Sequence, residues 1–114
     1  MSSTPLDPRL HVLPAAIREG IARLPGVAQR HGVRAVAIVG SAAVGNFSSD
    51  RSDLDLLVDF GEYQPGLARR ALAFHREVEQ LFQCRVDVLS VHGLRSPHWR
   101  ALHDAQKVPV YAAA

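Results

Sequence analysis

The segment Asp53–Phe60, which reads DLDLLVDF, constrains the fold of this chain more than any other. In a β-strand successive side chains point to opposite faces, so residues two apart share a face. That alternation places Asp53 and Asp55 together on one side. The other side then carries Leu54, Leu56, Val58 and Phe60. We therefore expect a strand with one face in the core and two neighbouring carboxylates on the opposite face.

The rest of the chain alternates between helical and strand patterns. Short apolar runs rich in β-branched residues predict further strands at Arg34–Val39, Arg85–Leu89 and Val108–Tyr111. Helical spacing of apolar residues predicts helices at Leu13–Leu24 and Leu67–Phe82, with short helical pieces at Ala42–Val44 and Pro97–Ala105. This order predicts a small α/β (α+β) fold, in which helices pack on one face of a sheet.

Two details of the helices are also predicted. Pro25-Gly26 is expected to interrupt the first helix, with a short second piece reaching His31. On the helix Leu67–Phe82, the side opposite the apolar stripe is expected to be solvated. That side carries Arg69, Arg70, Arg76 and Glu79.

Length and composition limit what kind of protein this is. A chain of 114 residues is the size of one domain, and we expect a flexible N-terminus at 1–10 and a single domain at 11–114. Such a chain has no room for a large second lobe, so an acceptor substrate would have to come from a partner. No apolar run approaches the roughly 20 residues of a membrane helix, no signal peptide is recognisable, and Cys84 has no second cysteine to pair with. A cytoplasmic location with no membrane contact is expected, and the formal charge of +2 gives no support to nucleic-acid binding.

Three acidic residues are candidates for binding a cation. Asp53 and Asp55 repel each other unless a cation lies between them, and Mg²⁺ is the hard cation that prefers oxygen ligands. Asp87 lies in the middle of the predicted strand RVDVL, where burial of an unpaired charge would be costly. A charged residue there therefore suggests a partner or a functional role. If that strand lies beside Leu54–Phe60, Asp87 reaches the same site, and three acids can hold two ions. Pairing of Asp87 with Arg85 or Arg51 is the structural alternative.

Gly40-Ser41 follows the first predicted strand and precedes the predicted turn. Glycine allows the backbone to approach a ligand closely, and the Ser41 hydroxyl can bond a phosphate oxygen. The segment thus combines a candidate phosphate cradle with a candidate metal platform. A nucleoside triphosphate complexed with Mg²⁺ fits both.

With these residues in place, the chain resembles the nucleotidyltransferase superfamily of the DNA polymerase β type. The resemblance rests on Gly40-Ser41, a spacer, Asp53-Leu54-Asp55 and Asp87 on a later strand. The short length is similar to the minimal nucleotidyltransferases, or MNT proteins, which are antitoxins in HEPN/MNT toxin–antitoxin pairs. The resemblance implies the nucleotidyltransferase fold, with a small mixed sheet.

The resemblance also implies roles for these residues. Gly40 and Ser41 would bind the β- and γ-phosphates, and Asp53 and Asp55 would ligate two Mg²⁺ ions, for which Mn²⁺ could substitute. Asp87 would ligate the catalytic ion and help to deprotonate the attacking hydroxyl. The implied reaction is AMP transfer from ATP to a protein hydroxyl, a tyrosine of a partner HEPN toxin.

The sequence departs from the family pattern at two points. The spacer from Ala42 to Ser52 has eleven residues where the family usually has ten, and Val44 stands where the family often has an arginine. If that arginine contacts phosphate, its absence weakens nucleotide binding. The alternative is therefore an antitoxin with little or no catalysis that neutralises its partner by binding.

Overall fold

The computed structural model describes residues 8–44, 47–48, 53–91 and 107–113. The elements in these ranges are, in order, η1 (Pro8–Leu10), α1 (Ala15–Arg30), β1 (Ala35–Val39), η2 (Gly40–Ala42), β2 (Leu54–Asp59), α2 (Leu67–Phe82), β3 (Val86–Ser90) and β4 (Val108–Ala112). The helix expected at 97–105 lies outside the described residues. In the described ranges, no helix has both the length and the apolar character needed to span a membrane.

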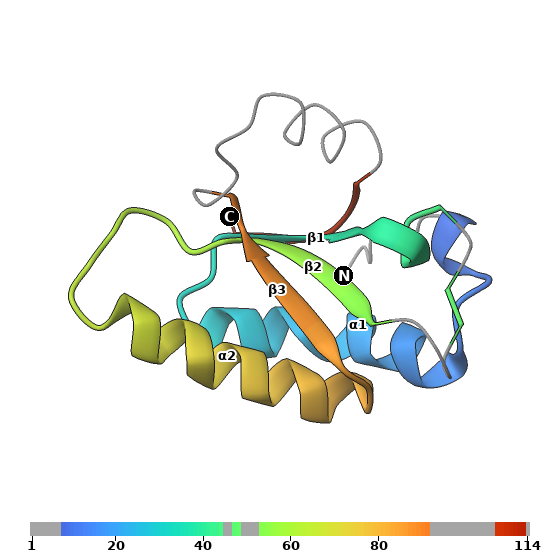
Figure 1. Cartoon of the computed structure of the whole chain (residues 1–114), viewed down its shortest axis with the longest axis horizontal. Coiled ribbons are helices and arrows are strands. Elements are labelled where there is room, and N and C mark those ends of the chain that lie inside the picture. The colour runs from blue at the N-terminus through green and yellow to red at the C-terminus, as the bar shows by residue number, and fades with distance from the viewer. Residues whose placement is uncertain (1–7, 45–46, 49–52, 92–106, 114) are drawn as a thin grey trace, which may run out of the picture.

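A four-stranded sheet in the order β3-β2-β1-β4 forms one layer, and α1 and α2 lie side by side on one of its faces (Figure 1). β1 is antiparallel to both β2 and β4, whereas β2 and β3 run parallel. The parallel pair is connected through α2, which is the long crossover that parallel strands need. The expected fold class, a mixed sheet with helices on one face, is confirmed.

The core lies between the sheet and the two helices. The predicted alternation of β2 holds, because Leu54, Leu56 and Val58 are fully buried beneath the helices. The side chains that meet them from the helices include Ile17, Ile21, Leu24, Phe74, Val78 and Phe82. Burial of one face of β2 leaves its acidic residues on the opposite face of the sheet.

The expected break in the first helix is wrong, because α1 continues through Pro25 to Arg30. A proline inside a helix lacks a hydrogen-bond donor and costs about 3 kcal/mol. Val27 and Ala28 continue the buried stripe beyond the proline and are 6% and 0% exposed. Their burial against the core offsets the local cost of Pro25.

The N-terminal boundary of the packed chain also lies earlier than residue 11. Pro8–Leu10 form the helix η1, and the Leu10 side chain is 1% exposed within the core. The terminus expected to be flexible at 1–10 thus contains a core residue, residues 1–7 lie outside the described ranges, and the single domain at 11–114 stays a prediction.

Arg70 is not part of a solvated helix face. Its guanidinium donates to the carbonyl oxygens of Gly32 and Phe60 at 3.0 and 3.1 Å, and to that of His31 at 3.3 Å. It also lies 6.0 Å from the centre of the Phe60 ring. Arg70 thus joins α2 to the loop before β1 and to the residue that follows β2.

The contact between α1 and α2 predicts opposite effects for two glycines of the same helix. A Cβ at Gly20 would lie 2.5 Å from Cδ1 of the buried Phe82, whereas a Cβ at Gly26 would meet nothing within 4 Å. Gly20→Ala should lower the free energy of unfolding by about 1–3 kcal/mol through overpacking. Gly26→Ala should raise it by up to about 1 kcal/mol, because alanine is the better helix former. Urea unfolding measures both, and equal effects of the two substitutions would contradict this packing.

Glu77 of α2 links the two helices through charge. Its carboxylate contacts the His31 ring nitrogen at 2.7 Å and also pairs with Arg30. The hydrogen bond to His31, together with Arg30, lowers the pKa of Glu77 below its usual value, although desolvation opposes the shift.

A group with a lowered pKa in the folded state stabilises the fold above its unfolded pKa and loses that effect as the pH falls through the folded pKa. Glu77→Gln should therefore destabilise the protein near neutral pH, and its difference from the wild type should shrink as the pH falls below about 4.5. Chemical unfolding at a series of pH values measures this, with Glu62→Gln on an exposed loop as the control. A difference that grows in acid would exclude the stabilising role.

Candidate active site

Asp55 and Asp87 are neighbours across the parallel strand pair. The register of β2 and β3 places Leu54 opposite Val86 and Asp55 opposite Asp87. Because Leu54 and Val86 are buried beneath the helices, the two aspartates lie on the face of the sheet away from the helices. Asp55 is half-buried and Asp87 is exposed. The condition on which the shared cation site depended, that the strand of Asp87 lies beside β2, is thus confirmed.

Gly40 lies directly against Asp55. β1 and β2 pair so that Val39 is opposite Asp55, and Gly40 follows with a φ of +72°. A Cβ built at Gly40 would be 2.3 Å from Oδ2 of Asp55 and 3.2 Å from its Cγ. Glycine is needed here both for the left-handed backbone and for the space that the carboxylate occupies.

The turn after Gly40 begins earlier than expected. The helical turn predicted at Ala42–Val44 is a 3-10 helix at Gly40–Ala42, followed by backbone hydrogen bonds from Ala43 to Gly40 and from Val44 to Ser41. Those bonds use the amide groups of Ala43 and Val44 within the turn. A phosphate contact from a main-chain amide of this turn would therefore have to come from Gly40, Ser41 or Ala42, a set that includes the two residues that the sequence indicated.

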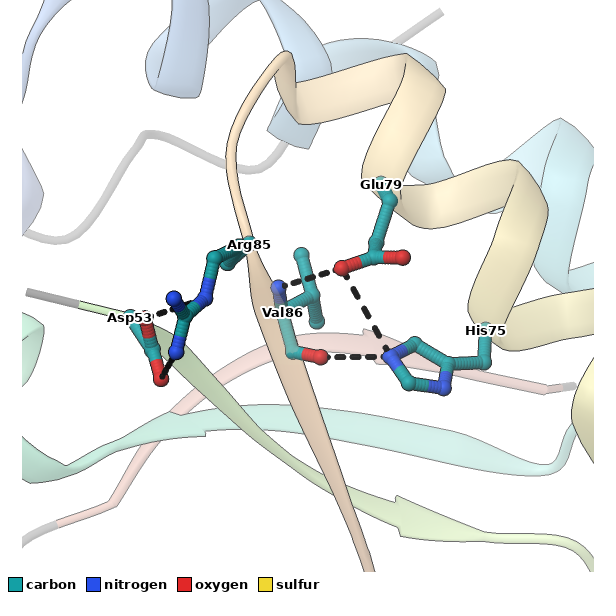
Figure 2. A network of polar contacts seen from close by, with 5 residues as sticks. All are labelled: Asp53, His75, Glu79, Arg85 and Val86. Atoms are coloured by element: carbon teal, nitrogen blue, oxygen red, sulfur yellow. Dashed lines mark hydrogen bonds and ion pairs between the residues drawn. The ribbon is translucent and has the colours of Figure 1, made fainter.

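Asp53 is engaged by an arginine from the neighbouring strand. It lies just before β2, and its two carboxylate oxygens face Nε and Nη2 of Arg85 at 3.3 and 3.4 Å (Figure 2). The structural alternative weighed for Asp87 paired that residue with Arg85 or Arg51. Arg85 pairs with Asp53 instead, and Arg51 lies outside the described residues. That Asp53 joins Asp55 and Asp87 at one cation remains a prediction.

The start of β3 is fixed to α2 by two side chains. The amide of Val86 donates to Oε2 of Glu79 at 3.1 Å, and the ring Nε2 of His75 donates to the carbonyl oxygen of Val86 at 2.5 Å (Figure 2). β3 is an edge strand, so these contacts satisfy backbone groups that the sheet does not pair. Glu79 was expected on the solvated side of the helix. The signal that could have placed it is its spacing of four residues from His75, which puts both on one face.

The donor set fits a divalent cation of the Mg²⁺ type. Asp53, Asp55 and Asp87 offer carboxylate oxygens, and the absence of a side chain at Gly40 lets the Asp55 carboxylate lie directly against the main chain there. Within the described ranges, no three His, Cys, Asp or Glu side chains already converge as a ready-made metal site. Carboxylates repel one another, so their convergence is unfavourable until a cation binds between them.

The comparisons with known proteins identify the family of the chain. The sequence profile of the nucleotidyltransferase domain matches residues 24–107, so the chain belongs to the nucleotidyltransferase domain family. A solved structure provisionally assigned as a minimal nucleotidyltransferase is 33% identical, with a TM-score of 0.68, and the match covers 81% of this chain and 90% of that one. The search of curated proteins found no significant match.

Solved toxin–antitoxin structures have the same fold at low identity. A mutant of the MntA–HpeT toxin–antitoxin complex is 10% identical, with a TM-score of 0.62, and the match covers 82% of this chain and 73% of that one. The structure of a tri-AMPylated HEPN toxin from Shewanella oneidensis in complex with its MNT antitoxin gives 11% identity and a TM-score of 0.59, covering 84% of this chain and 72% of that one. The resemblance to minimal nucleotidyltransferases that was inferred from the sequence is confirmed.

The close approach of Gly40 to Asp55 gives a prediction with a matched control. Gly40→Ala and Gly61→Ala both place a side chain at a positive φ, +72° and +81° respectively, which costs about 1–2 kcal/mol at each position. At Gly61 the nearest atom is Cδ of the flexible Arg34 side chain, whereas at Gly40 it is the Asp55 carboxylate. Gly40→Ala should therefore lower the free energy of unfolding by more than Gly61→Ala.

A double mutant isolates the contact itself. Asp55→Ala removes the carboxylate, so it should recover part of the loss caused by Gly40→Ala, and the two changes should be less than additive. Denaturant unfolding of the four variants measures the coupling. Strict additivity would mean that the Gly40 backbone and the Asp55 carboxylate are not in contact in solution.

Proposed function

We propose that this protein is a nucleotidyltransferase that transfers AMP from ATP to a hydroxyl, a tyrosine of a HEPN-family toxin, and thereby acts as an antitoxin. The observation that carries the proposal is the placement of Asp55 beside Asp87 with the Gly40 backbone against the Asp55 carboxylate. These residues come from three separate parts of the sequence. Together they match the positions that the family pattern assigns to metal and phosphate binding.

Each residue has a defined task in this reaction. Gly40 and Ser41 bind the β- and γ-phosphates, and Asp53, Asp55 and Asp87 are the residues that would hold Mg²⁺. The metal ions would neutralise the triphosphate and the charge that develops on the leaving group. Asp87 accepts the proton of the attacking hydroxyl. The hydroxyl oxygen forms a bond to the α-phosphorus, the bond from that phosphorus to the bridging oxygen breaks, and pyrophosphate leaves.

Similar proteins support the nucleotide and the acceptor. One toxin–antitoxin structure of this fold contains AMP-PNP, an ATP analogue, at 14% identity and a TM-score of 0.64, over 82% of this chain and 73% of that one. Another contains a HEPN toxin that carries AMP groups beside its MNT antitoxin. The ATP analogue in the first structure and the AMP groups on the toxin in the second support ATP as the nucleotide and a partner protein as the acceptor of AMP.

Neutralisation by binding alone is the second candidate function. Val44 follows the turn that starts at Gly40, and its apolar side chain is 49% exposed where the family often has an arginine. An exposed apolar residue beside the site suits contact with a protein better than contact with a phosphate.

Label transfer separates the two functions. The protein is incubated with ATP labelled at the α-phosphate, Mg²⁺ and a HEPN-family toxin, and the toxin is expected to acquire label. Asp87→Asn should abolish the transfer, because it removes both a metal ligand and a proton acceptor. Asp59→Asn is the matched control, since Asp59 lies at the other end of β2 and its Oδ1 accepts from the amide of Gly61, which asparagine can preserve. Tight complex formation with no label on the toxin would favour the binding function instead.

Thermal unfolding tests the site without the partner. Ligands that bind only the folded state stabilise it by about 2.7 kcal/mol at a hundredfold excess over Kd. Mn²⁺ with ATP should therefore raise the Tm by several degrees. The double variant Asp53→Ala/Asp55→Ala should show no such rise, and a rise that persists in it would exclude this site.

A further inference from the structure

Arg85 holds one of the three candidate metal ligands. Its guanidinium faces both carboxylate oxygens of Asp53, with Nε to Oδ1 at 3.3 Å and Nη2 to Oδ2 at 3.4 Å (Figure 2). This is the two-point contact that a planar guanidinium makes with a carboxylate. A positive charge of the protein itself therefore lies on Asp53, next to the pair of Asp55 and Asp87.

The main chain of Arg85 cannot move far from this position. Its carbonyl oxygen accepts the amide of Leu54 at 2.9 Å, which fixes it to the start of β2. The next residue, Val86, is held on both its amide and its carbonyl by Glu79 and His75 of α2. A change in the contact between Arg85 and Asp53 therefore requires rotation of a side chain, and rotation of Arg85 leaves β3 and Asp87 in place.

The contact is also weak enough to be broken. The side chain of Arg85 is 84% exposed and that of Asp53 is 31% exposed, and both distances lie at the long end of the hydrogen-bond range. An exposed ion pair of this kind changes an equilibrium constant by about fivefold at most. A divalent cation carries twice the charge of the guanidinium, so it can displace Arg85 from the carboxylate.

The charges around the site explain why such a contact is useful. Asp53 directly precedes β2, which carries Asp55, and Asp55 lies opposite Asp87 on β3, so three formal negative charges repel one another at this end of the sheet when no cation is bound. Arg85 directly precedes β3 and is two residues before Asp87, and its contact with Asp53 offsets part of that repulsion.

We propose that Arg85 is a positioning residue that competes with the divalent metal for Asp53. It binds the Asp53 carboxylate in the nucleotide-free protein and releases it by side-chain rotation when the metal arrives. This inference rests on the proposed function, since it requires that Asp53 is a metal ligand.

The test measures binding of Mn²⁺ alone, from the electron paramagnetic resonance signal of the free ion. Arg85→Gln should tighten Mn²⁺ binding by about two- to fivefold, because the competing cation is gone. Arg85→Lys keeps the charge and should stay within about twofold of the wild type. Arg76→Gln removes a positive charge from an exposed position of α2 and should leave the affinity unchanged. A purely structural role of Arg85 predicts the opposite sign, with weaker binding in Arg85→Gln.

A double mutant shows whether the competition is for Asp53. Asp53→Asn removes the contested carboxylate, so adding Arg85→Gln to it should change the Mn²⁺ affinity by less than about twofold. Tightening of the same size in both backgrounds would overturn the proposal, and so would an unchanged or weakened affinity in Arg85→Gln alone. Either of these outcomes for Arg85→Gln excludes only the role of Arg85, provided that the wild type binds Mn²⁺ and the Asp53→Ala/Asp55→Ala variant does not. A wild type that binds no Mn²⁺ would exclude the proposed function as well.

Discussion

The parallel pairing of β2 with β3 is the interaction on which the candidate site depends. It places Asp55 opposite Asp87, although 31 residues separate the two in the chain. Backbone hydrogen bonds fix the register of the pair, and a slip of one residue would turn every side chain of β3 to the other face. The contacts of Glu79 and His75 with Val86 hold the edge strand in that register from the side of α2. The geometry of the acids is therefore set by the backbone and by a helix that contributes none of the candidate ligands.

The two faces of the sheet differ in role: one packs against the helices, and the other carries the candidate site. The face toward α1 and α2 is continuous and apolar, and it contains fully buried side chains such as Leu56 and Val58. Among the described residues, the apolar cluster on the opposite face is small and consists of Ala37, Val39 and Leu57, with Leu89 and Val91 packed against it. The acidic residues lie beside this cluster, at the end of β2 nearest to Gly40. The free energy gained by apolar burial on the helix side can thus offset the electrostatic repulsion between the carboxylates on the other side.

Much of the architecture could be predicted because local patterns decided it. The helix Leu67–Phe82 was predicted with the bounds that the structure has, since its apolar stripe and its flanking loop residues agree. The break predicted at Pro25 failed because burial of Val27 and Ala28, which is a tertiary effect, outweighs a local preference. Arg70 was misplaced for a related reason. A helical pattern cannot reveal that backbone carbonyls of two other segments lie within reach of its guanidinium.

The sequence by itself determined which residues belong to the candidate site, because Gly40-Ser41, Asp53-Leu54-Asp55 and Asp87 combine a strand alternation with a family pattern, and the nucleotidyltransferase domain profile matches residues 24–107. It also determined which face of β2 is buried. Only the tertiary structure decided that Gly40 touches Asp55, that Asp55 and Asp87 are direct neighbours, and that Arg85 holds Asp53. The physical reason is that these contacts depend on strand direction and register, which arise from backbone pairing between distant segments and leave no periodic signal in any one of them.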